Sequence, residues 1–181
     1  MMKKICLLAF SLLIFLLSFN TSFAKDLMAT SSSKAEINYE LPYPGLLPDN
    51  PLYFLRIIRD KTINFLIADP LKKAEFNLLQ ADKRLNAGIY LFNKGKISIS
   101  ISTISKGENY FEESLEKAKK ARHEGMEINE ITRKLIDSSK KHQEILKSLE
   151  EKSPQNFKSS FDLQLKRVNG FIKEAVSLTL K

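Results

Sequence analysis

The stretch that decides the fold is DPLKKAEFNLLQADKRLNAGIYLFNKG, residues 69–95. Its start is typical of a helix, because Asp69 can accept hydrogen bonds from free amides and Pro70 needs no amide partner at the first helical position. Small or apolar residues then recur at spacings of three and four until Gly95, a stop signal. The positions 71, 74, 78, 81, 85, 88 and 92 hold Leu, Ala, Leu, Ala, Leu, Gly and Phe. This seven-residue period predicts a long helix that packs lengthwise against others.

A second series of the same kind crosses residues 127–151. Ser153 and Pro154 form a similar cap–proline pair before the C-terminal segment. The stretch GLLPDNPLYFLR (45–56) contains another before the first helix, where Asp49 or Asn50 can cap the helix and Pro51 can take its first position. The positions 128, 131, 135, 138, 142, 145 and 149 of the second series hold Ile, Ile, Leu, Ser, His, Ile and Leu. We therefore expect a bundle of several such helices.

The segment ISISISTIS, residues 97–105, is ambiguous. It alternates with a period of two, as a strand does, but its isoleucines also continue a helical seam through Phe111, Leu115 and Ala118 with Glu108 as the one misfit. FDLQL (161–165) and VSLTL (176–180) have the same ambiguity. We favour helix for all three because turn signals between strands are absent, and we expect Gly125 to end the helix that contains 97–105.

The sequence therefore predicts an all-α fold, an elongated antiparallel bundle of about five helices. Because the connections are short, consecutive helices are expected to be antiparallel neighbours. The first helix carries Phe54, Leu55, Ile58, Phe65 and Leu66 on one broad face. Tyr53 and Phe54 are expected to anchor it on its neighbours, a recognition groove being the alternative. The expected helices span residues 51–68, 70–94, 97–123, 127–151 and 154–180.

The N-terminus has the layout of a secretory signal peptide. Lys3 and Lys4 precede an apolar run over 5–19, and Ser22-Phe23-Ala24 ends a polar exit. The run is shorter than the roughly 20 residues of a spanning helix, so we expect cleavage after Ala24, with a retained membrane anchor as the alternative. The predicted organisation is a signal peptide at 1–24, a flexible Ser- and Pro-containing leader at 25–44 and one helical domain at 45–181. We expect an exported protein, in the periplasm, outside the cell or at the envelope.

Composition narrows the possible functions. Cleavage after Ala24 would remove Cys6, the only cysteine, so disulfides and thiolate metal sites are not expected. The formal net charge is +8, but lysines alternate with glutamates along the chain, which is typical of solvated helix faces. Nucleic-acid binding needs a concentrated basic face, so with this diffuse pattern no nucleic-acid partner is expected. Weak attraction to anionic envelope polymers or lipid remains compatible with this charge.

No pattern for catalysis is present. Adjacent acids such as Glu112 and Glu113 point in different directions around a helix, and neither a nucleophile elbow nor a phosphate loop occurs. We expect His123 to be a helix C-terminal cation, and His142 to be a semi-buried polar group that helps to set register. His142 is the one weak candidate for a metal ligand, and no cofactor is expected. Changing it to Leu is expected to leave the stability equal or higher.

The residues 47–88 resemble an exported bacterial domain family of unknown function. Its members carry a turn L-P-x-S-P-x-Y-x-L-K, then a helix opening with D-P-x-K-K-A-E and containing A-x-x-R-L. Asn50 and Arg56 stand where the family usually has Ser and Lys, and Asn86 and Ala87 where an acid is frequent. The resemblance implies an exported, helical, Lys/Glu-rich domain and supplies no activity. The matching residues are Leu47, Pro48, Pro51, Tyr53, Leu55, Asp69, Pro70, Lys72, Lys73, Ala74, Glu75, Ala81, Arg84 and Leu85, with Asp49 beside the first Pro.

We thus expect a non-catalytic interaction or structural module of the cell envelope that binds protein partners. The alternative is a carrier of a small ligand or metal that uses the bundle interior, where His142, Ser138 and Gly88 interrupt the apolar seams. A regulator whose activity resides in another protein is a third possibility. Heptad seams serve packing within and between chains alike, so the oligomeric state stays open.

Overall fold

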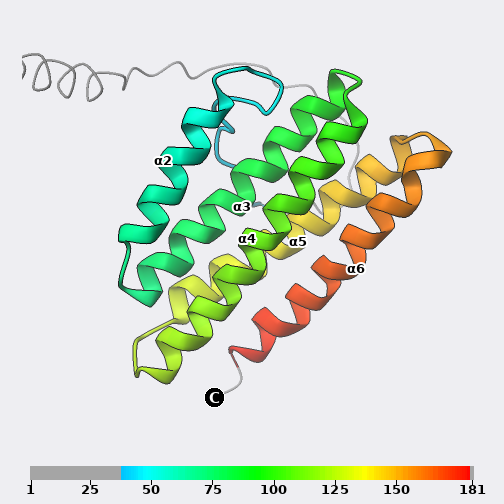
Figure 1. The fold of residues 1–181 in the computed structure, drawn as a ribbon. Coiled ribbons are helices and arrows are strands. Elements are labelled where there is room, and N and C mark those ends of the chain that lie inside the picture. The colour runs from blue at the N-terminus through cyan, green and yellow to red at the C-terminus, as the bar shows by residue number, and fades with distance from the viewer. Residues whose placement is uncertain (1–37, 180–181) are drawn as a thin grey trace, which may run out of the picture. The chain divides into compact units, whose positions relative to one another are not determined.

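The computed structural model describes residues 38–179, which fold into helices with no strand among them (Figure 1). The all-α prediction is confirmed, and residues 97–105 are helical throughout. Each helix starts and ends within three residues of its expected bounds. The helices are α2 (Tyr53–Leu66), α3 (Pro70–Asn93), α4 (Ile97–His123), α5 (Asn129–Lys152) and α6 (Gln155–Ser177).

Two helical hairpins, α3/α4 and α5/α6, make up the bundle. Between the hairpins, α4 lies beside α6 and α3 beside α5. Ion pairs fix the direction of α4 and α6: Arg167 reaches Glu112, and Lys119 reaches Glu174 about two turns further along both helices. The two helices therefore run parallel.

The consecutive helices α4 and α5 lie diagonally across the bundle and contact each other sparingly. They still run in opposite directions, as expected of helices joined by a short connection, but they are not side by side. The connection from 124 to 128 is long enough to cross the end of the bundle, and Ile128 within it is buried in the core.

Small residues bring α3 and α4 close together. Ser114 donates to the carbonyl of Ala74 at 2.7 Å, and Ser100 donates to that of Gly88 at 2.7 Å. Midway, a Cβ added at Gly107 would lie 3.2 Å from the carbonyl oxygen of Ala81. These pairs recur every seven residues along both helices, and Ser100 of ISISISTIS is one of the packing positions. Tertiary contacts thus override the strand-like alternation.

The helix ends follow the predicted signals except at the starts of α2 and α6. Helix α2 begins at Tyr53 with Leu52 at its N-cap, so Pro51 and the expected caps Asp49 and Asn50 precede the helix. Asp69 accepts hydrogen bonds from the amides of Leu71 and Lys72, and the two glycines at positions 95 and 125 adopt φ of 74° and 80° after α3 and α4. Ser153 does not cap α6: its hydroxyl donates backward to the carbonyl of Glu150.

The core lies between the two hairpins. Phe111 stacks on Phe171 with ring centroids 5.1 Å apart, and Phe161 meets Phe92 edge-on at 5.9 Å. Leu85 of α3 and Leu135 of α5 are also fully buried in this core. The apolar seams predicted for α3 to α6 therefore face one another.

The segment before the first helix is attached to the bundle. Tyr39 donates to Asp82 at 2.6 Å, Asn86 donates to the carbonyl of Pro42 at 2.9 Å, and Leu41 packs on the core. For residues 38–44 the prediction of a flexible leader is therefore wrong, because their polar groups have partners on α3. The predicted signal peptide and residues 25–37 lie outside the described residues. Within 38–179, no helix combines the length and apolarity required to cross a membrane.

Candidate functional site

A cluster of five polar side chains lies at the centre of the bundle: Tyr39, Asp82, Glu108, Ser138 and His142, called here the His142 cluster. His142 places Nδ1 3.0 Å from Glu108 Oε1 and Nε2 3.0 Å from Asp82 Oδ1. Ser138 donates to Asp82 Oδ1 at 2.6 Å, and Tyr39 donates to Asp82 Oδ2. The leader, α3, α4 and α5 thus meet at one network.

The cluster favours the charged imidazole. Burial by itself would lower the pKa of His142, but the carboxylates of Glu108 and Asp82 outweigh it and raise this pKa to about 9. Each ring nitrogen faces a carboxylate oxygen, so a proton on both nitrogens satisfies both contacts. Burial, and then the charge of Asp82, raise the pKa of Tyr39 far above its usual range, which keeps the phenol protonated as a donor.

The sequence indicated part of this cluster. His142 and Ser138 occupy seam positions, and Glu108 is the residue that does not fit the apolar face of α4. The structure explains the misfit, because the side chain of Glu108 reaches across the diagonal to His142. Asp82 and Tyr39 were missed: Asp82 follows Ala81 of the seam, and Tyr39 lies outside any periodic segment. His142 is fully buried, where a semi-buried position was expected.

The arrangement offers little to an interior ligand. The ring nitrogens of His142 and the hydroxyl of Ser138 are engaged within the cluster, and Ile104 fills the space beside Gly88. Among residues 38–179, no group of three or more His, Cys, Asp or Glu side chains has a geometry that could hold a metal ion. An open cavity of about 190 Å³ lies beside the cluster, lined by Tyr39, Glu75, Leu78, Leu79, Asp82, Ile131 and Lys134.

The motif residues of α3 have structural roles. Arg84 is buried, donates to Gln80 and lies over the ring of Tyr110 at 4.1 Å. Ala74, Ala81 and Leu85 are fully buried in the core. Pro70 is buried at the first position of α3, while Lys73 is half-buried one turn later.

The motif residues of the turn before α2 are more exposed. Asn50 accepts from the amide of Leu52, whereas Asp49 pairs with Lys94 and Lys96 at the α3–α4 connection. Pro48 and Tyr53 are half-buried, and Pro51 and Leu55 are exposed. The turn is thus tied to one end of the bundle. His123 ends α4 among Lys120 and Arg122, in the C-terminal position expected for a cation.

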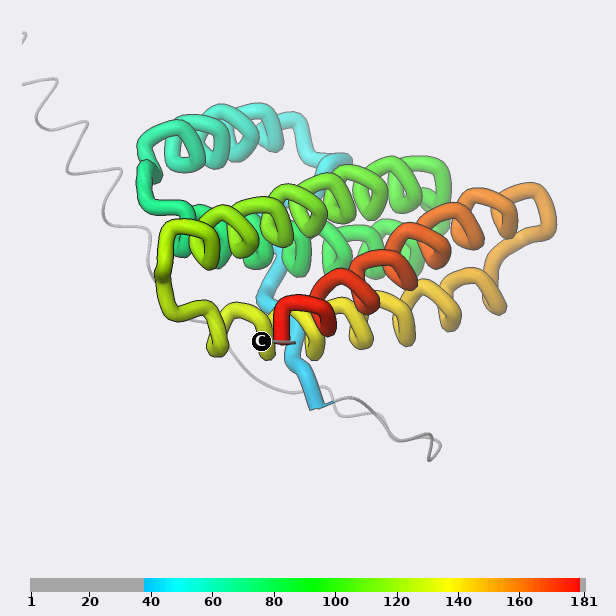
Figure 2. Tube along the Cα trace, turned by 90° about the horizontal axis from the view of Figure 1, so that it is seen from below, coloured from blue at the N-terminus to red at the C-terminus, as the bar shows by residue number. Residues whose placement is uncertain are grey.

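The second candidate site is on α2, which contacts only α3 among the other helices (Figure 2). Five of its apolar residues are at least half exposed, and Phe65 is 85% exposed. We call this surface the α2 face; it consists of Phe54, Leu55, Ile58, Phe65 and Leu66. The expectation that Phe54 anchors the helix is therefore wrong.

The side of α2 that packs on the protein is charged. Arg56 and Asp60 are its two buried residues. Arg56 donates to the carbonyls of Pro44 and Leu46, and Asp60 accepts from Arg59 at 2.8 Å. Burial, then Arg56 and Arg59, lower the pKa of Lys83 on the facing side of α3. Since α2 rests on polar groups, its apolar side has no place in the core.

The sequence matches the family described as "Domain of unknown function (DUF5667)" over residues 45–156, more than half of the chain. The match begins at the turn before α2 and ends in the first turn of α6, so it covers Asp82, Glu108, Ser138, His142 and the α2 face but not Tyr39. Neither the curated proteins nor the solved structures contain a match. The chain therefore belongs to the DUF5667 family, whose function is unknown.

Proposed function

We propose that this protein is an exported, non-catalytic helical module of the cell envelope that acts by contact, and that the α2 face is its contact surface. One observation carries the proposal: α2 is inverted, with Arg56 and Asp60 buried and large apolar side chains in solvent. Contiguous exposed apolar surface of this kind is typical of interaction sites.

The rest of the molecule supports a contact role. The central polar groups hold the bundle together through one another. The outer faces of α3 to α6 are mainly polar, with separate exposed apolar residues such as Leu79 on α3 and Leu163 on α6. The five apolar residues of α2, by contrast, have no role in the core. Substituting them should therefore change contacts without changing the fold.

The test is retention of the full chain in its own cell envelope. The double variant Phe65→Ser/Leu66→Gln is expected to be released into the soluble fraction under washing that retains the unmodified protein. Leu163→Gln is the matched control, because Leu163 is an apolar residue 58% exposed on α6. Equal retention of all three proteins would contradict a contact role for α2. The intact mass of the recovered protein tests cleavage after Ala24.

The carrier of a small ligand or metal is the second candidate, and the cavity beside Tyr39 and Asp82 favours it. Native mass spectrometry of the envelope-recovered protein tests it directly. A carrier would show added mass that denaturation removes, and Lys134→Gln at the cavity rim should reduce the loaded fraction. A bare native mass would count against this candidate.

A further inference from the structure

Basic side chains of α2 border the α2 face. The five residues of the α2 face follow two adjacent lines along the helix, and Lys61 and Arg59 border these lines on opposite sides. Both cations are exposed, whereas the only acid of the helix, Asp60, is buried beneath them. The outward side of α2 is therefore apolar in the middle, basic at both edges and free of exposed carboxylates.

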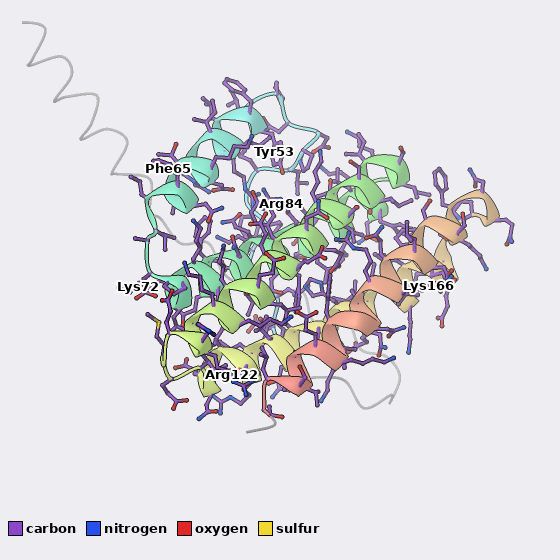
Figure 3. All side chains as sticks on the ribbon, turned by 60° about the horizontal axis from the view of Figure 1, so that its bottom comes forward. Tyr53, Phe65, Lys72, Arg84, Arg122 and Lys166 are labelled. Carbon is purple, nitrogen blue, oxygen red and sulfur yellow. The ribbon has the colours of Figure 1, made fainter. Side chains whose placement is uncertain are left out.

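The basic character continues past the end of the helix. Figure 3 places Phe65 on the outer side of α2 and Lys72 at the same end of the molecule. Lys72 is exposed in the first turn of α3. Phe65 and Leu66, the most exposed apolar residues of the α2 face, thus lie at the end of α2 that connects to this part of α3.

This pattern distinguishes between occupants. A helix with Phe and Leu on one face and Lys or Arg at its edges lies in the interface of an anionic membrane, where the basic side chains reach the headgroups. A second copy fits less well, because two α2 faces in contact would bring Arg59 and Lys61 of both copies together.

We propose that the α2 face docks on an anionic lipid surface, with the helix axis in the plane of the membrane and Phe65 and Leu66 inserted among the acyl chains. This inference rests on the proposed contact function and names its partner. The polar attachment of α2 to α3 leaves the α2 face available, since no apolar contact with the bundle has to be broken.

The chain contains no tryptophan, which allows a site-specific test in the full-length protein. Phe65→Trp gives a single fluorophore on the α2 face, and Leu163→Trp gives a matched one on α6. Each protein is mixed with phosphatidylglycerol or phosphatidylcholine vesicles whose acyl chains carry bromine as quencher. Because the apolar segment at 5–19 is common to both proteins, any membrane binding by that segment affects the two equally.

We expect the Phe65→Trp emission to shift to the blue and to be quenched on phosphatidylglycerol, with the Leu163→Trp emission unchanged. Adding Arg59→Gln and Lys61→Gln should weaken the response about 30-fold, since each cation near an anionic surface contributes a factor of about five. Added salt should weaken it likewise.

The outcomes separate the two proposals. No quenching at Phe65→Trp on phosphatidylglycerol would overturn lipid as the occupant. Equal quenching on phosphatidylcholine would overturn the anionic character of that lipid surface. A blue shift without vesicles that grows with protein concentration would identify a second copy instead and leave the contact function standing. No response in any condition, together with unchanged envelope retention of Phe65→Ser/Leu66→Gln, would overturn the contact function as well.

Discussion

Helix α2 and the α3/α4 hairpin are both amphipathic, but they bury opposite kinds of side chain. In the hairpin, small and apolar residues face inward, and the polar groups among them are matched one to one, as Ser114 is with the carbonyl of Ala74. In α2, the charged pair of Arg56 and Asp60 faces inward and the aromatics face solvent. Amphipathic periodicity therefore reveals that a helix has two sides but leaves open which side meets the protein.

The largest expected effect tests the cluster that unites the bundle. Changing His142 to Leu leaves Asp82 and Glu108 buried without their cation, and breaking such a buried pair costs about 3–5 kcal/mol. The geometry thus reverses the expectation, drawn from the seam alone, that this change is neutral or stabilising. Urea unfolding measures the loss. Adding Glu108→Gln should recover part of it, and an unchanged midpoint for His142→Leu would show that the cluster contributes little.

The second prediction concerns pH. Because folding raises the pKa of His142 from its ordinary value of 6.5 to about 9, its contribution to stability is complete below pH 6.5 and is lost as the pH rises through 9. The free energy of unfolding should fall across this window by up to about 3 kcal/mol. The His142→Leu variant, unfolded at the same series of pH values, should lack the fall.

The third prediction sharpens the contrast in packing. A Cβ at Gly88 would lie 2.4 Å from Cγ1 of Ile104, so Gly88→Ala should destabilise by about 1–3 kcal/mol through overpacking. Gly170 on α6 has no atom within 4 Å of the same position, and Gly170→Ala should stabilise by up to about 1 kcal/mol. Thermal unfolding of both variants compares them. Effects of the same sign would contradict the close approach of α3 and α4.

The smallest effect belongs to the α2 face. Phe65→Ser should change the free energy of unfolding by no more than about 0.5 kcal/mol, since the ring is exposed. Phe111→Ala, at a fully buried ring, should cost about 3–5 kcal/mol. A loss of several kcal/mol for Phe65→Ser would mean that α2 packs inward in solution.

The fold was largely predictable because seams, prolines and glycines all indicate helices. The diagonal placement of α4 and α5 was not predictable. It depends on the contact of Glu108 with His142 across the core, and a single polar contact between two helices produces no periodic pattern in the sequence. Glu108 was visible as an exception within the seam of α4, but its partner could not be assigned. The orientation of α2 was mispredicted because the polar groups that receive it, such as Lys83, belong to another helix.

The sequence separations within the two hairpins and within the His142 cluster carry a kinetic consequence. Contacts near the α3–α4 turn join residues as few as 12 apart, whereas His142 joins residues 34 and 60 positions away. Short loops close at lower entropic cost, so we expect the hairpins to form in the folding transition state and the cluster to form after it. In stopped-flow experiments, His142→Leu should then accelerate unfolding while leaving the refolding rate nearly unchanged.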